Sequence, residues 1–277
     1  MYHLEENEQN TAFNVEPFDS TVWEVVSMAG RIDLGAELKA AIETRDWQNI
    51  QDIFENITHQ MTFYTAVYVV LPHMVQLLEQ VMEEGDLEHA HMLIWNLGIC
   101  LAADIPGNRM GEPDSPLMDD YQAAAKKLSG LVKHLINTRL QDIQELSNEQ
   151  KSTLLAATLA ILGERELVFA GMEAFAAGAV EELHFMCGGD CEFFAECVDP
   201  YEEESEIGLI LPQEYEPEAW DGVSYDNPFV WTTGIAELFG AEEQIEVLRW
   251  LYGSLTCPEC GQTKRVLDYM ITYLTEA

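Results

Sequence analysis

Six cysteines carry the most specific chemistry in this sequence of 277 residues. Cys257 and Cys260 stand in the run Cys-Pro-Glu-Cys-Gly, where the spacing of the two thiols and the following glycine allow both sulfurs to meet one metal ion. A second glycine-rich turn, Cys-Gly-Gly-Asp-Cys, lies earlier in the chain. Thiolates from two such turns complete a tetrahedral structural zinc site. The predicted zinc ligands are Cys187, Cys191, Cys257 and Cys260.

Other assignments of the cysteines stay open. Cys197 or His184 could replace one ligand, because the first pair has three intervening residues rather than two. Reduced thiols without a metal are the main alternative. A disulfide or a redox pair is a further one, but the N-terminus is unlike a secretory signal and no thioredoxin-like strand–helix pattern precedes Cys257. Cys100 has apolar neighbours and is expected to be a buried core thiol.

Histidine and tyrosine side chains form a second candidate site. His59, Tyr64 and His73 lie within fifteen residues of one another and could serve a metal-dependent enzyme or binding scaffold. They also bracket a helix entry and a proline, where polar side chains commonly satisfy exposed backbone groups. The sequence has no phosphate-binding loop, dinucleotide fingerprint or nucleophile elbow. We therefore expect an interaction protein, with the enzyme as the alternative.

The charge of the chain is strongly acidic and unevenly distributed. There are 50 acidic and 13 basic residues, a formal net charge of −37. No lysine or arginine occurs from Glu166 to Glu246. A field of one sign attracts a partner of the opposite sign and accelerates encounter. We expect a basic protein partner, with a solvated acidic loop as the alternative. The predicted partner-binding residues are Glu202, Glu203, Glu204, Glu206, Glu214, Glu216, Glu218 and Asp221.

The same charge balance argues against two classes of partner. Direct binding of nucleic acid requires basic surface that neutralises phosphates, and docking on an anionic membrane also requires basic residues. No apolar run reaches the ~20 residues that a membrane-spanning helix needs. Because the N-terminus is polar and acidic, we expect a cytoplasmic protein.

Apolar residues recur at spacings of three and four along most of the chain, which predicts amphipathic helices. The apolar segments cover residues 47–57, 63–81, 87–103, 117–146, 148–162, 164–177, 230–239, 242–252 and 264–274. Asp46 or Thr44 is the expected cap of the first segment and Asn148 of the fifth. Pro72 is expected to kink or break the second segment, and Gly163 is expected to end the fifth.

Consecutive helices with short links predict a mainly α fold, an antiparallel helical stack of the HEAT-like kind, although no strict sequence period is visible. Near the cysteines, residues 183–185 and 207–211 could pair as a small sheet. We expect a partly irregular N-terminal segment over residues 1–30 and a helical domain over 31–180. An acidic insert with the cysteine turns and C-terminal helices covers 181–277, and zinc is expected to hold it together as a small α+β part.

One stretch of the sequence resembles a known group of proteins. Trp47 is followed by the run HQMTFYTAVYVVLPH at residues 59–73. It resembles bacterial HEAT-like helical proteins in which a Trp-containing helix precedes a His-Gln segment, a tyrosine, small residues and a Leu-Pro-His turn. Several members also carry Cys-x-x-Cys pairs late in the chain.

Some members of that group look like immunity or accessory proteins of bacterial toxin systems. The resemblance covers about thirty residues well and the rest of the chain in outline. Together with the acidic charge and the absence of an enzyme motif, the resemblance favours an immunity protein that binds and neutralises a cationic toxin, with a nuclease as the leading candidate.

Overall fold

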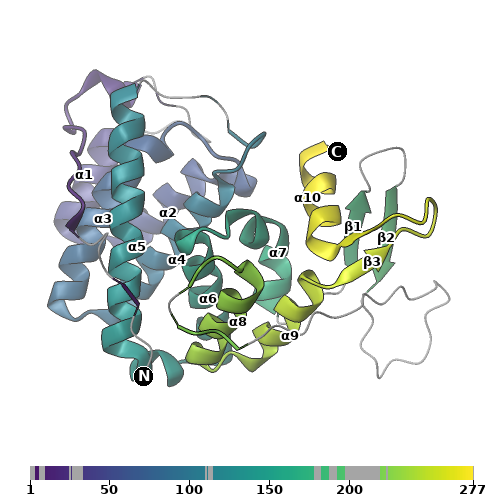
Figure 1. Cartoon of the computed structure of the whole chain (residues 1–277). Helices are drawn as coiled ribbons and strands as arrows, with labels where there is room; N and C mark the ends of the chain where they lie inside the picture. Colours follow the sequence, from purple (N-terminus) through teal and green to yellow (C-terminus); the bar gives the residue numbers. More distant parts are fainter. Residues whose placement is uncertain are drawn as a thin grey trace. The chain divides into compact units, whose positions relative to one another are not determined.

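The computed structural model describes residues 4–5, 10–24, 26, 34–109, 111, 115–177, 182–186, 192–196, 219–222 and 224–276. These residues are mainly helical, which confirms the mainly α class that the apolar spacing predicts (Figure 1). The contacts of the chain divide it into two compact units. The N-terminal unit consists of Leu4–Thr138 and Ala157–Arg165, and the C-terminal unit is built from Arg139–Ala156 and Glu166–Ala277.

The helices and strands follow one another along the chain in the order that Figure 1 labels. They are η2 (Thr21–Glu24), α1 (Leu34–Thr44), α2 (Trp47–Ile57), η3 (His59–Met61), α3 (Val67–Glu84), α4 (Leu87–Ala103), α5 (Ser115–Gln144), α6 (Asn148–Leu162), α7 (Arg165–Ala177), β1 (Glu182–Met186), β2 (Glu192–Glu196), α8 (Pro228–Phe239), α9 (Glu242–Leu251), β3 (Ser254–Thr256), β4 (Thr263–Arg265) and α10 (Val266–Glu276).

Helix α3 lies at the centre of the N-terminal unit, since every residue from Val67 to Val75 is buried. Helix α4 packs against it, and α2 contacts both α1 and α4. A kink or a break was expected at Pro72, and the structure shows no break, because α3 continues through this residue. Pro72 is the sixth residue of α3, so the hydrogen bond it cannot donate would reach only the carbonyl of Tyr68 in the first turn. The surrounding core holds the helix together at this point.

The same two-residue turn joins four successive pairs of helices. In each turn the second residue donates its backbone N–H to the carbonyl five residues earlier, which is the bond that ends a helix in the Schellman motif. The four bonds are Asp46 to Ala41, Asp86 to Val81, Glu164 to Leu159 and Ala241 to Ala236. The residue before each donor has a positive φ, and three of the four are glycines, at positions 85, 163 and 240. A helix end of this kind reverses the chain within two residues.

Of the two helix caps that the sequence predicts, one is confirmed and the other is displaced. Asp46 accepts a hydrogen bond from the backbone N–H of Asn49 and caps α2, as predicted. For α6 the predicted cap, Asn148, is wrong by one residue. Ser147 accepts from the N–H of Gln150, and the Gln150 side chain accepts from the N–H of Ser147. Such a reciprocal pair satisfies two N–H groups that the first turn leaves without helical partners.

Two antiparallel hairpins and the last three helices occupy the C-terminal unit. Strand β1 pairs with β2, and β3 pairs with β4. A small sheet beginning near residue 183 was expected, and β1 confirms that start. Its partner strand is residues 192–196, while the expected partner, 207–211, lies outside the described residues. The β3–β4 hairpin was not predicted, because strands of three residues are too short to show an alternating pattern.

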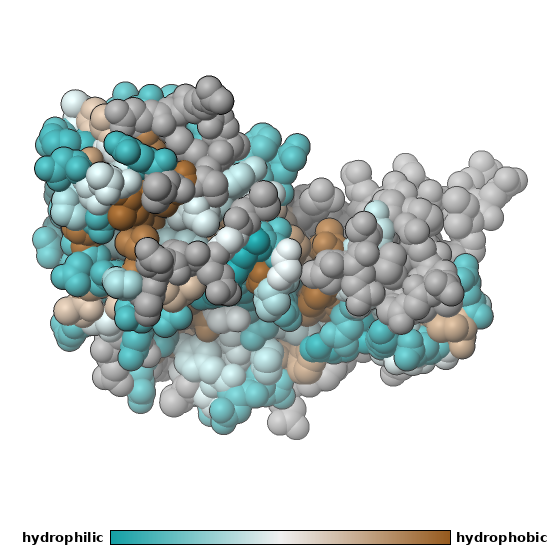
Figure 2. All heavy atoms as spheres, turned by 90° about the horizontal axis from the view of Figure 1, so that it is seen from above, coloured by the Kyte–Doolittle hydropathy of each residue, from teal (hydrophilic) through white to brown (hydrophobic). Residues whose placement is uncertain are grey.

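The surface of the described residues is mainly hydrophilic. Within this part of the chain, Leu274 is the one large apolar side chain that is exposed, at 47%. On the face seen in Figure 2, apolar residues form small groups among hydrophilic ones. No helix in the described residues combines the length and the apolar character required to cross a membrane.

Candidate functional site

The β3–β4 hairpin presents the later cysteine pair at its turn. Cys257 follows directly after β3, and its backbone N–H donates to the Gln262 carbonyl at 2.8 Å. Gly261, whose φ is +73°, donates its N–H to the Cys257 carbonyl at 3.0 Å. Glycine adopts this φ at no steric cost, so the residue after the second cysteine closes the turn as the sequence implies. Cys257 is buried and Cys260 is exposed.

The earlier cysteine pair lies between β1 and β2 in the sequence. Cys187 follows β1 and Cys191 precedes β2, and the last residue pair of this ladder is Met186 with Glu192. The two cysteines themselves, like Cys197, lie outside the described residues. His184 belongs to β1, opposite Phe194 in the register. Helix α10 contacts both β1 and β4 (Figure 1).

The described residues contain no cluster of three or more His, Cys, Asp or Glu side chains able to hold a metal. Because two of the four predicted ligands lie outside this part of the chain, the zinc site stays a prediction. Cys100, by contrast, is confirmed as a core thiol. It is fully buried in α4, and burial raises its pKa far above the usual value for a thiol.

His59, Tyr64 and His73 do not form one cluster. His59 is exposed in η3, Tyr64 is half-buried, and neither makes a side-chain hydrogen bond, ion pair or ring contact with His73 in the described structure. The turn around His59 has a structural explanation. Gln60 and Met61 both adopt left-handed backbone angles, and the Asn108 side chain donates to the Met61 carbonyl at 2.7 Å.

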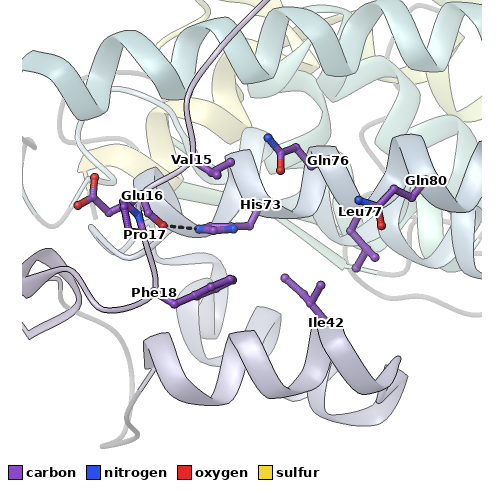
Figure 3. Close-up of a pocket in the computed structure, with 9 residues that line it drawn as sticks. All are labelled: Val15, Glu16, Pro17, Phe18, Ile42, His73, Gln76, Leu77 and Gln80. Carbon is purple, nitrogen blue, oxygen red and sulfur yellow. Dashed lines mark hydrogen bonds between the residues drawn. The ribbon is translucent and has the colours of Figure 1, made fainter.

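His73 anchors the N-terminal segment on α3. Its Nε2–H donates to the Glu16 carbonyl at 2.9 Å, and its ring stacks on Phe18 with centroids 4.4 Å apart (Figure 3). The Trp23 ring also contacts the His73 ring, with the two ring centroids 5.7 Å apart. A pocket of about 220 Å³ lies beside His73, lined also by Ile42 of α1 and by side chains of α3. Burial lowers the pKa of His73, outweighing the opposite effect of the Glu16 carbonyl and charge.

A first prediction concerns the response of His73 to pH. The unfolded histidine takes up a proton near pH 6.5, whereas the buried ring resists protonation until its lower pKa is reached. The unfolded state therefore binds protons first, and the free energy of unfolding decreases as the pH falls below 6.5. His73→Gln should flatten this decrease in urea unfolding measured at a series of pH values. His59→Gln, at an exposed position, serves as the control and should keep it. Equal slopes in wild type and His73→Gln would contradict the prediction.

A buried carboxylate that the sequence did not single out organises the far end of α4. The Asp104 side chain is 2% exposed. Its Oδ1 accepts from Arg109 Nε at 2.6 Å, and its Oδ2 accepts from Arg165 at 2.5 Å and from the Tyr121 hydroxyl at 2.7 Å. Burial, and next the negative charge of Asp104, raise the pKa of Tyr121 well above its usual value. A saturated carboxylate of this kind fixes structure and is not free to act on a substrate.

In the acidic segment, every carboxylate whose burial the structure describes is exposed to solvent. Of the predicted partner-binding residues, only Asp221 is described; it is exposed, and it accepts from the Ser224 N–H at 2.8 Å. The other seven lie outside the described residues. Beyond that set, the acids between residues 222 and 246 are all exposed, namely Asp226, Glu237, Glu242, Glu243 and Glu246. Glu246 forms an ion pair with Arg249 at 3.1 Å.

No family model, curated protein or solved structure matches this chain. The resemblance to HEAT-like proteins therefore stays an expectation from thirty residues or so of sequence.

Proposed function

We propose that this chain is an interaction protein that binds and neutralises a cationic protein through its acidic segment from Glu166 to Glu246. The observation that carries the proposal is the charge: −37 overall, and no lysine or arginine across that segment. Negatively charged carboxylates repel one another, and this repulsion destabilises the folded chain. A partner of opposite sign removes that repulsion on binding, so the charge favours a complex.

Two further observations support recognition by charge. The acids described between residues 221 and 246 are all exposed, so a partner can reach them. The described surface offers almost no exposed large apolar side chain apart from Leu274. Apolar burial is the usual alternative source of affinity, and the described residues provide little of it.

The scaffold that we propose is a HEAT-like stack of helical hairpins. The recurring two-residue turns support it, because three of the four join two helices of ordinary length that pack together as a hairpin. Helices α1 and α2 pack together, as do α3 and α4, and α8 and α9. The turns at Asp46 and Asp86 are 40 residues apart, close to the period of about 40–47 residues in HEAT repeats.

The partner class that fits best is a bacterial toxin, in particular a nuclease with a cationic active cleft. A nuclease must bind the phosphates of its substrate, so its cleft carries lysine and arginine. An acidic protein can occupy such a cleft as the nucleic acid does. The chain would then act as a cytoplasmic immunity protein, and the gene beside it should encode a basic toxin domain.

The second prediction is a test by charge reversal. Glu202, Glu203, Glu204 and Glu206 changed together to lysine should lower the association rate for the neighbouring toxin about tenfold at low salt. The difference should shrink at physiological salt, where the screening length is ~8 Å. If one of these acids enters the toxin cleft, its loss should instead raise the dissociation rate and cost about 2–5 kcal/mol. Surface plasmon resonance at several salt concentrations measures both rates.

The matched control reverses four exposed acids outside the segment, Glu55, Glu83, Glu88 and Asp119. It changes the net charge equally but leaves the proposed surface intact. An equal loss of rate in both variants would show that only the total charge matters, against the proposed surface. Unchanged rates and unchanged protection against the toxin in the first variant would contradict binding through this segment.

A further inference from the structure

Along the chain, each of the two cysteine pairs falls between the two strands of a hairpin. In β3–β4 the ladder closes with Thr256 opposite Thr263, and Cys257 comes next in the chain. In β1–β2 the ladder closes with Met186 opposite Glu192, and Cys187 and Cys191 are the next residues inward on each side. Each pair therefore belongs to the connection between two antiparallel strands.

Both hairpins pack on the same helix. Helix α10 contacts β1 and also β4, which it follows directly in the chain (Figure 1). Tyr269 of α10 is fully buried, and its hydroxyl donates to the Gln262 carbonyl at 2.6 Å. Gln262 is the residue whose carbonyl also accepts from the Cys257 N–H. The helix thus fixes the turn that carries Cys257 and Cys260 and lies against the strand that leads into Cys187.

We propose that Cys187, Cys191, Cys257 and Cys260 bind one zinc ion that joins the two hairpins. Thiolates in pairs on two tight turns supply the four soft ligands of a closed tetrahedral site. Each thiol loses its proton to solvent as its sulfur bonds to the metal, and no electron is transferred. Because all four positions are filled by protein, no place remains for a water or substrate, and the site is structural.

The zinc ion would link the hairpin before the acidic segment to the hairpin after it. Residues 191 to 257 run from one hairpin to the other and include helices α8 and α9 with their exposed acids. Metal binding supplies folding free energy that a segment of repelling charges lacks. This inference is independent of the proposed partner, because the site would exist in the isolated chain.

The third prediction is the metal content of the full chain, purified without chelator. Mass spectrometric metal analysis should find about one zinc ion per chain. Replacement of zinc by cobalt should give the thiolate-to-cobalt charge-transfer absorption of a tetrahedral site, a readout that needs no variant. Each of the four single variants, Cys187→Ala, Cys191→Ala, Cys257→Ala and Cys260→Ala, should reduce the zinc content to near zero. Cys100→Ala and Cys197→Ala are the controls and should retain the metal.

Three outcomes would overturn the proposal. The first is a chain without zinc whose four thiols all react with a thiol reagent in the native state. The second is zinc that persists when both Cys187 and Cys191 are replaced by alanine. The third is zinc lost in Cys197→Ala but kept in Cys191→Ala, which would assign the fourth position to another ligand.

Discussion

Asp104→Ala is expected to lower the free energy of unfolding of the N-terminal unit by about 3 kcal/mol, toward the lower end of the range for breaking a buried charge pair. The Asp104 side chain is 2% exposed and accepts hydrogen bonds from two arginines and a tyrosine. Alanine leaves the Tyr121 hydroxyl buried without this acceptor and the two guanidinium groups without their shared anion. Both arginine side chains are about one third exposed, so water takes over part of their solvation.

Comparing Asp104→Ala with Asp104→Asn separates the contribution of the charge to stability from that of the side-chain shape. Asp104→Asn keeps the volume and one acceptor oxygen but removes the charge, and should cost about 1–3 kcal/mol. The control is Glu43→Ala, which removes an exposed carboxylate that pairs with Lys39 on α1. A pair so exposed contributes at most about 1 kcal/mol. Urea unfolding followed by circular dichroism measures all three, and a cost for Asp104→Ala no greater than for Glu43→Ala would contradict the assigned role.

The helices could be predicted from sequence because their signals are local. The spacing of apolar residues in α2 and the aspartate before it determine both the buried face and the first residue, and the structure confirms both. Caps are less certain, since neighbouring polar residues compete for the position. Asn148 and Ser147 are adjacent, and Ser147 is the cap because Gln150 can return its hydrogen bond.

The Asp104 cluster could not be predicted because its members are far apart in the chain. Arg109, Tyr121 and Arg165 follow Asp104 by 5, 17 and 61 residues. Among 50 acidic residues, nothing in the local sequence marks this one as buried. The cysteine pairs are the opposite case, because their spacing of a few residues encodes a turn, and the structure shows such a turn at Cys257.

The helical hairpins repeat in backbone geometry without repeating in sequence. The four turns share a positive φ and one hydrogen bond, yet their second residues are two aspartates, a glutamate and an alanine, at positions 46, 86, 164 and 241. A backbone carbonyl accepts that bond whatever the side chain is. The 30-residue helix α5 also stands between the second and third turns and interrupts the spacing. Because of these two features, the recurrence of the turns is not visible as a period in the sequence.

The close approach of α4 and α6 predicts that adding a methyl group at Gly98 destabilises the protein. A Cβ atom added at Gly98 would lie 2.5 Å from Ala157 Cα and 2.6 Å from its Cβ. Helix propensity alone predicts that Gly98→Ala stabilises α4 by about 1 kcal/mol. We expect a net loss of about 1–3 kcal/mol instead, because the new atom meets the backbone of a packed helix. Gly98→Leu should cost more.

The double variant tests whether the loss comes from this contact. Ala157→Gly removes the Cβ that the new methyl group meets but leaves the Cα in place, so it should recover only part of the stability lost in Gly98→Ala. The two changes should be non-additive by about 0.5–3 kcal/mol in a double-mutant cycle measured by urea unfolding. If Gly98→Ala raised the free energy of unfolding, α4 and α6 would be able to move apart at little cost. If the effects of the two changes were additive, the stability lost in Gly98→Ala would not come from the contact with Ala157.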